Sequence, residues 1–222
     1  ISYKVIGGLE VSEKIMKEAF QGKDILVTGG CGSIGSEIVK QLIKYNPKKI
    51  RVFDNNESAQ FFFSEELKND AIRHLIGDIR DKERVIRACR GVDYVFHAAA
   101  LKHVPLCEYN PFEAVKTNVL GTENLIEACV ELDVDKLLSI GTDKSVNPIN
   151  TMGATKLLAE KLITSDHGVT KLKTAGVRFG NVLNSKGSVI PIFKKQIENG
   201  GPVTLTSAEM TRFFMSIDEA VG

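Results

Sequence analysis

A glycine-rich turn near the start of the sequence has the residue spacing that binds the phosphates of a dinucleotide. It follows an apolar run at residues 25–27 and fits both the relaxed motif that starts at Gly29 and the strict one that starts at Gly30. The glycines of such a turn allow a tight bend, close approach of backbone N–H groups to a pyrophosphate, and packing of helix on strand. The first N–H groups and the dipole of the following helix attract the phosphate charge. The residues that we expect at this phosphate site are Gly29, Gly32, Ser33, Ile34 and Gly35.

An acidic residue lies where the ribose of the dinucleotide would be bound. Residues 50–53 have the composition of the next strand, and Asp54 ends it at the expected distance past Gly35. Because a glycine turn can also serve the fold alone, this acid is what favours the binding interpretation. A carboxylate accepts a ribose 2′-hydroxyl and repels a 2′-phosphate, and the next residue is Asn55 rather than an arginine. We therefore expect NAD as the cofactor, with NADP as the alternative.

The rest of the chain alternates strongly between strand-like and helix-like segments. We expect strands at residues 25–28, 50–53, 74–76, 93–97, 136–140 and 174–179, with helices at 59–67, 111–132 and 151–164. This alternation predicts an α/β fold with a doubly wound parallel sheet of the Rossmann type. Ligands of such sheets lie beyond the carboxyl ends of the strands. The residues that close the later strands are Asp78, Ile79, Ala98, Ala99, Ala100, Thr142, Asp143, Lys144 and Asn181.

Three segments at or just after the strand ends contain residues that could bind a ligand or take part in catalysis. The small residues 98–100 would leave room for a flat nicotinamide or a ribose, although tight helix–sheet packing explains them nearly as well. Asp143 and Lys144 bring a carboxylate beside an amine, which could be either an acid–base pair or an exposed ion pair. Lys102 follows the alanines and is a candidate for contact with substrate phosphates. For His97 we expect a packed or hydrogen-bonded side chain, and for His103 a place in a loop.

The composition is that of an ordinary globular protein. The 222 residues are 43% hydrophobic and 26% charged, with a formal net charge of +1, which argues against nucleic-acid binding. We expect no membrane span in this chain, because no apolar run approaches roughly 18 residues. We expect no metal site and a cytoplasmic location, because the cysteines are scattered and have no histidine at ligand spacing. These cysteines are Cys31, Cys89, Cys107 and Cys129.

The chain divides into three expected parts. Residues 1–22 form an N-terminal arm with a short helix at 11–20, and residues 23–180 form the dinucleotide-binding domain. Residues 181–222 begin a smaller substrate-binding region, with a helix at 189–198 and a strand at 203–205. Because the sequence starts at Ile1 and stops just inside a helical pattern, we expect a piece of a longer protein. Its flanks could hold a membrane anchor.

Several motifs together resemble the extended short-chain dehydrogenase/reductases. They are the glycine turn, Gly77-Asp-Ile79, Ala98-Ala-Ala100, Asn118 and Gly153-Ala-Thr-Lys156. Longer strings narrow the resemblance to the nucleotide-sugar 4,6-dehydratases of polysaccharide biosynthesis, which act on UDP-N-acetylglucosamine. These strings are Ala99-Ala-Leu-Lys-His-Val-Pro105, Glu108-Tyr-Asn-Pro111, Thr142-Asp-Lys-Ser-Val-Asn-Pro148, Arg178-Phe-Gly-Asn-Val182, Gly187-Ser-Val-Ile-Pro191 and Met210-Thr-Arg-Phe213. The resemblance runs from about Lys23 to the last residue.

The resemblance implies a redox-neutral elimination of water. Hydride leaves the fourth carbon of the sugar, water is lost across the fifth and sixth carbons, and the hydride returns to the sixth. By analogy, Asp143 is the acid for the departing 6-hydroxyl and Lys144 is the base for the proton on the fifth carbon. Thr142 would hydrogen-bond the 4-oxygen, and Lys156 would bind the nicotinamide ribose and lower nearby pKa values by its charge.

Met152 departs from the pattern of the wider superfamily, which has a tyrosine base at this position. A thioether has no proton to exchange. One branch of the dehydratases carries methionine here, so the resemblance holds, and the proton transfer passes to Asp143, Lys156 or an ordered water.

The resemblance also implies partners and further contact residues. The expected substrate is a UDP-N-acetylhexosamine, bound by Lys102, Asn181, Ser188 and Arg212, and Asn118 is expected at the cofactor. The long helix at 111–132 is of a kind that forms dimer faces, so we expect a homo-oligomer. Two alternatives stay open: a UDP-sugar 4-epimerase, which has no need for the Asp143–Lys144 pair, and a non-catalytic dinucleotide-sensing module.

Overall fold

The computed structural model describes residues 13–183, 189–205, 207–209, 211 and 213–222. Its centre is a sheet of parallel strands in the order β3-β2-β1-β4-β5-β6. The strands are β1 (Asp24–Thr28), β2 (Lys49–Asp54), β3 (Ile72–Ile76), β4 (Tyr94–His97), β5 (Lys136–Thr142) and β6 (Lys173–Phe179). The predicted doubly wound parallel sheet is confirmed. Its order reverses between β1 and β4, and ligands of such sheets bind beyond the strand ends at this switch point.

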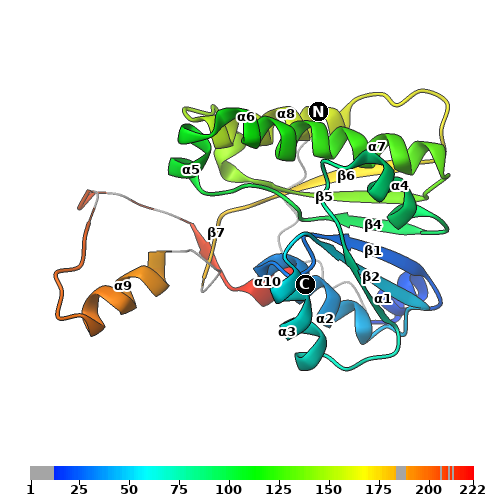
Figure 1. The fold of residues 1–222 in the computed structure, drawn as a ribbon, viewed down its shortest axis with the longest axis horizontal. Coiled ribbons are helices and arrows are strands. Elements are labelled where there is room, and N and C mark those ends of the chain that lie inside the picture. Colours follow the sequence, from blue (N-terminus) through cyan, green and yellow to red (C-terminus); the bar gives the residue numbers. More distant parts are fainter. Residues whose placement is uncertain (1–12, 184–188, 206, 210, 212) are drawn as a thin grey trace.

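Helices cover both faces of the sheet (Figure 1). One face carries α1 (Glu13–Phe20), α2 (Ser33–Ile43), α3 (Glu57–Glu66) and α10 (Ile217–Val221). The other carries α4 (Lys82–Cys89), α5 (Val104–Tyr109), α6 (Pro111–Ala114), α7 (Gly121–Glu131) and α8 (Thr151–Thr164). Because both faces are covered, the central strand β1 is buried along its whole length, and its residues alternate between two cores. Ile25 and Val27 pack toward α2, whereas Leu26 packs toward α4 and α7.

The long helix expected at 111–132 is divided in the structure. Between α6 and α7 lies η1 (Val115–Leu120), a π-helical segment with i→i+5 hydrogen bonds. Such wide turns are uncommon and occur mostly as local insertions at functional sites. Here the insertion includes Asn118, whose side chain is only 1% exposed.

Local capping explains small shifts in the other helix boundaries. Asn56 accepts a hydrogen bond of 2.9 Å from the backbone N–H of Ala59, so α3 begins two residues before the expected position 59. The expected helix at 11–20 is present from Glu13, and its first two positions lie outside the described residues. The helices at 151–164 and 189–198 have the expected bounds, as α8 and α9 (Val189–Glu198).

The C-terminal segment adds a second small sheet, in which β7 (Asn181–Val182) pairs with β8 (Phe214–Met215) in parallel. The strand expected at 203–205 is wrong, because its backbone pairs with no strand in the described part of the chain. Thr204 is held instead by the side chain of Gln196, which bonds its hydroxyl at 2.8 Å and its N–H at 3.1 Å. Helix α10 then returns to pack on α2, with Val221 against the core beneath it.

Candidate active site

A cavity of about 970 Å³ lies at the carboxyl ends of the parallel strands. It is lined by the glycine turn, the ends of β2 and β3, the segment after β4, the end of β5, the start of α8, and both strands of the small sheet. The predicted site residues that line it are Gly29, Gly32, Ser33, Ile34, Gly35, Asp54, Asn55, Asp78, Ile79, Ala98, Ala99, Ala100, Lys102, Thr142, Lys144, Met152, Lys156 and Asn181. Asp143 and Asn118 are not part of the lining, and Ser188 and Arg212 lie outside the described residues.

The glycine turn has the geometry of a phosphate cradle. Gly29 adopts a φ of +65°, and a Cβ there would lie 2.6 Å from the backbone nitrogen of Ala99. A Cβ on Gly35 would collide with the carbonyl of Gly29, so this glycine lets α2 pack against the turn. In the described structure no side chain caps α2 at Gly32, which leaves the start of the helix to a ligand. The turn therefore fits the pyrophosphate of a dinucleotide.

Asp54 ties the glycine turn to the end of β2. Its Oδ2 accepts a hydrogen bond of 3.0 Å from the N–H of Cys31, and its Oδ1 accepts one of 3.0 Å from the N–H of Asn56. Each carboxylate oxygen has a second lone pair, so Asp54 can still accept bonds from ribose hydroxyls. Cys31 itself is buried and acts here through its backbone.

Next to Asp54 lies an ion-pair cluster that the sequence did not predict. Asn55 Nδ2 donates to Oδ2 of Asp78 at 3.3 Å, and Arg80 binds the same carboxylate through Nε at 2.9 Å and Nη2 at 2.6 Å. Arg80 Nη1 also donates to Glu113 of α6 at 2.8 Å. The bond from Arg80 outweighs partial burial and lowers the pKa of Asp78 to about 2. Arg80 and Glu113 both line the cavity.

His97 joins the glycine turn to η1 and α7 rather than facing the cavity. Thr122 donates its hydroxyl to the carbonyl of Asn118 at 2.7 Å, so it accepts from His97 Nε2 at 2.9 Å. The other ring nitrogen, Nδ1, then accepts from the hydroxyl of Thr28 at 2.7 Å. The side chain is 4% exposed, and burial, together with the charge of Lys156, lowers its pKa to about 3. The expectation of a hydrogen-bonded His97 is confirmed, and His103 lies exposed in the loop before α5.

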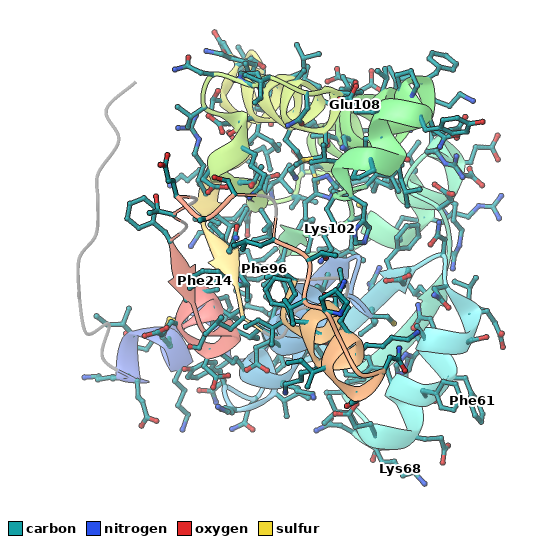
Figure 2. The ribbon with its side chains drawn as sticks, turned by 90° about the vertical axis from the view of Figure 1, so that its left-hand side faces the viewer. Phe61, Lys68, Phe96, Lys102, Glu108 and Phe214 are labelled. Atoms are coloured by element: carbon teal, nitrogen blue, oxygen red, sulfur yellow. The ribbon has the colours of Figure 1, made fainter. Side chains whose placement is uncertain are left out.

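Asn118 holds the segment that forms one wall of the cavity. Its side chain accepts a hydrogen bond of 2.8 Å from the N–H of Leu101 and donates one of 3.0 Å to the carbonyl of the same residue. It donates a second bond of 3.0 Å to Thr155 of α8. Figure 2 shows Lys102, the next residue of this wall, near the centre of the molecule, whereas Glu108 lies at its outer edge. Asn118 therefore acts on the cavity through the backbone of the 98–101 segment.

The residues at the end of β5 form a hydrogen-bonded group. Thr142 donates its hydroxyl to Oδ1 of Asp143 at 3.0 Å, and Lys144 Nζ donates to the same oxygen at 3.0 Å. Lys144 Nζ also donates to Oδ1 of Asn181 at 3.1 Å, which joins β5 to β7. Partial burial raises the pKa of Asp143, but the hydrogen bonds and charge of Lys144 and the hydrogen bond from Thr142 have a larger, opposite effect. The pKa of Asp143 therefore lies below its ordinary value. Asp143 is thus ionised at neutral pH.

Lys156 and Met152 share one face of α8, four residues apart. Lys156 Nζ donates to the carbonyl of Ile140 at 2.7 Å, and burial lowers its pKa to about 8 even though the charge of Glu160 opposes the shift. Met152 is 4% exposed and packs with Cys107 and Ala114. The lysine therefore brings an amine that titrates near neutral pH to the cavity, whereas Met152 brings an apolar surface.

Behind the β5 turn lies a second group that sequence reasoning missed. Arg178 of β6 binds Glu160 through Nε at 2.8 Å and Nη2 at 2.6 Å, and Ser145 Oγ lies 3.2 Å from Oε2 of Glu160. Ser145 is also 2.7 Å from the carbonyl of Thr142, to which its hydroxyl points. The spacing of Glu160 four residues after Lys156 could have suggested a shared helical face. No sequence spacing links Arg178 to Glu160, because the two residues lie on different elements, β6 and α8, that meet only in the folded protein.

Comparison with known proteins places this geometry in a family. Residues 25–222 match the family described as polysaccharide biosynthesis protein. The chain belongs to this family. It is 63% identical over 205 residues to an uncharacterized membrane protein of Methanocaldococcus jannaschii and 45% identical over 207 residues to a UDP-N-acetylglucosamine 4,6-dehydratase (inverting) of Campylobacter jejuni. It is 42% identical over 212 residues to a UDP-glucose 4-epimerase of Rickettsia prowazekii.

Solved structures agree with this family assignment. Pen from Bacillus thuringiensis superposes with a TM-score of 0.89 at 46% identity, covering 91% of this chain and 66% of that one. A dTDP-glucose 4,6-dehydratase from Streptomyces venezuelae, solved with NAD bound, superposes with a TM-score of 0.81 at 25% identity, covering 89% and 69%.

The chain spans less than two thirds of the length of these curated relatives. The alignments with the first two curated relatives each cover 91% of this chain but 62% of the relative, and that with the epimerase covers 91% and 61%. The helices of the described structure are all too short or too polar to cross a bilayer.

Proposed function

We propose that the protein is a nucleotide-sugar 4,6-dehydratase that acts on UDP-N-acetylglucosamine in polysaccharide biosynthesis. The observation that carries the proposal is the hydrogen-bonded group of Thr142, Asp143 and Lys144 at the same cavity as the glycine turn. The similarity to a UDP-N-acetylglucosamine 4,6-dehydratase supports both the reaction and the substrate.

The cofactor in this proposal is NAD, and the residues present fit it. The glycine turn would hold the pyrophosphate, Asp54 would accept the adenosine ribose, and Lys156 would bind the nicotinamide ribose. The NAD-bound dehydratase of the same fold supports this cofactor. NAD at this site would accept hydride from the fourth carbon of the sugar and return it to the sixth.

Thr142 and Asp143 give the 4-hydroxyl proton a route that Met152 does not offer. Thr142 lines the cavity and donates its hydroxyl to the ionised carboxylate of Asp143, which is not part of the lining. A proton taken from the 4-hydroxyl can therefore pass through Thr142 to Asp143. Asp143 then returns a proton through the hydroxyl of Thr142 to the departing 6-hydroxyl, which leaves as water, so Asp143 ends the cycle as it began.

Lys144 is positioned to move the proton on the fifth carbon. It lines the cavity, and its Nζ is fixed between Asp143 and Asn181. Protonation of Asp143 removes the negative charge that faces Lys144, which favours the neutral amine that a base must be. Lys102, Asn181, Ser188 and Arg212 would hold the nucleotide sugar in this proposal.

The test is the product formed from UDP-N-acetylglucosamine and NAD in deuterated water, analysed by mass spectrometry and NMR. We expect a 4-keto-6-deoxy sugar nucleotide with deuterium at the fifth carbon. UDP-N-acetylgalactosamine without deuterium would instead show a 4-epimerase, the alternative that the Rickettsia relative favours. Binding of NAD without any reaction would point to a dinucleotide-sensing module.

The organisation of the protein completes the proposal. Residues 23–180 form the dinucleotide-binding domain after an N-terminal arm at 1–22, and residues 181–222 begin the substrate region.

Exposed apolar side chains on α5 and α6, among them Leu106, Tyr109 and Phe112, support a homo-oligomer. The four buried cysteines, which no disulfide joins in the described structure, agree with a cytoplasmic location. Light scattering of the purified protein tests the oligomer.

A further inference from the structure

The charges that line the cavity are separated into two ends. Lys102, Lys144 and Lys156 line the end near β5 and α8. The other end, next to the glycine turn, is lined by Asp54, Asp78, Arg80 and Glu113 and is called the acidic end below. Asn55 joins its members, because it follows Asp54 in the chain and donates to Asp78.

Arg80 is the positive charge of the acidic end, and two carboxylates hold it. Asp78 binds its Nε and Nη2, and Glu113 of α6 binds its Nη1. Both carboxylates are ionised at neutral pH, because Arg80 lowers the pKa of Asp78 and Lys116 lowers the pKa of Glu113. Lys116 contacts the other oxygen of Glu113 at 2.9 Å and is not part of the cavity lining. The lining therefore carries three negative charges against one positive charge at this end.

The side chains of this cluster are partly exposed to solvent. The side chains of Arg80, Asp78 and Glu113 are 42%, 26% and 43% exposed. Ion pairs at such positions contribute little to folding, because water and salt screen them. Their effect on a charged ligand in the same cavity is larger, because the phosphate of such a ligand carries up to two negative charges.

We propose that Glu113 is a cofactor-specificity residue, which pairs with Arg80 so that the acidic end rejects the 2′-phosphate of NADP and accepts NAD. The inference rests on the proposed dinucleotide site. Asp54 alone would repel the phosphate, but an arginine in the same cavity could offset that repulsion by binding it. Glu113 opposes this by binding the Nη1 of the guanidinium.

The test measures binding of NAD and of NADP separately by isothermal titration calorimetry. In Glu113→Gln we expect the ratio of the NADP to the NAD dissociation constant to fall about three- to tenfold, as one unit charge is removed near a phosphate at moderate screening. The control Glu83→Gln removes the same charge from α4, where the side chain is 86% exposed and does not line the cavity. We expect its ratio to match the unmodified protein.

A second pair of variants separates release of Arg80 from a general change in charge. Arg80→Gln should raise the ratio of the NADP to the NAD dissociation constant. Adding Glu113→Gln to Arg80→Gln should lower this ratio by much less than Glu113→Gln lowers it in the unmodified protein. Thermal unfolding confirms that each variant is folded. An unchanged ratio in Glu113→Gln, or an unmodified protein that prefers NADP, overturns the inference. A protein that binds neither nucleotide instead overturns the proposed function.

Discussion

The hydroxyl of Thr142 donates a hydrogen bond of 3.0 Å to Oδ1 of Asp143, and this bond connects the cavity to a carboxylate that does not itself line it. Thr142 and Asp143 are neighbours in the sequence. Only the structure shows that Asp143 is connected to the cavity through the hydroxyl of Thr142. In the proposed mechanism this bond is the proton route, because the thioether of Met152 has no proton to exchange.

Thr142→Val tests this route. Valine keeps the shape of the side chain but has no hydroxyl, so the 4-hydroxyl proton cannot reach Asp143. We expect kcat to fall about 100-fold or more, as is usual for loss of a proton-transfer group, while KM changes little. Thr142→Ser is the matched control, because it keeps the hydroxyl, and should retain most of the activity. Steady-state product formation measures both, and a fully active valine variant would show that the proton leaves by another path.

Lys144→Met should stop proton exchange at the fifth carbon. Methionine has a similar length but has no amine, so nothing at this position can take the proton. We expect turnover to fall about 100- to 10,000-fold, with no deuterium incorporated from deuterated water into recovered substrate or product. NMR of the sugar ring measures the deuterium. Deuterium at the fifth carbon in this variant would assign the base to another residue.

The parts of the site that the sequence predicted are those formed by local patterns. The glycine turn, Asp54 and the Thr142–Lys144 segment each follow a strand, and strand ends of a parallel sheet meet at one edge. The groups that the sequence missed depend on contacts between distant segments. Glu113 reaches Arg80 from 33 residues away, and Arg178 reaches Glu160 from a neighbouring strand. No periodicity within either segment reports such a pairing.

The errors in the fold have the same origin. Residues 203–205 have strand-like composition, but a strand requires a partner, and in the described structure Gln196 takes that place through its side chain. The long helix at 111–132 has continuous helical periodicity, which does not distinguish an α-helical turn from the wider turn of η1. Asn118 in that wider turn bonds Leu101, and this tertiary contact is not visible in the periodicity.

The pKa of Lys156 predicts a pH limit on activity. Its ammonium is lost as the pH rises through about 8, so binding that needs this charge weakens above that pH. Glu160 raises the pKa of Lys156, and Glu160→Gln removes that effect. We therefore expect the alkaline limb of the kcat/KM profile to move to lower pH in Glu160→Gln, beyond any loss of stability from the broken pair with Arg178. Profiles between pH 6 and 10, with unfolding followed in parallel, separate the two, and an unmoved limb would leave Glu160 a purely structural role.

The lowered pKa of His97 predicts that the free energy of unfolding decreases at acidic pH. Its pKa is about 3 in the folded protein and about 6.5 in an unfolded chain, so the unfolded state binds more protons between these values. The folded pKa is depressed, and stability should therefore fall as the pH drops from about 6.5 toward about 3. One such group contributes up to about 5 kcal/mol across that window.

His97→Gln should weaken this acid dependence, because glutamine can bond Thr28 and Thr122 but does not titrate. Urea unfolding at pH 7 and at pH 4.5 measures it as the difference between the two free energies of unfolding. That difference should be about 2 kcal/mol smaller in the variant than in the unmodified protein. The Tm values of both proteins at pH 7 are compared to exclude misfolding. His167→Gln is the matched control, since His167 lies in the loop after α8 and outside the Thr28–Thr122 bridge. Equal differences for the variant and the unmodified protein would show that folding does not lower the pKa of His97.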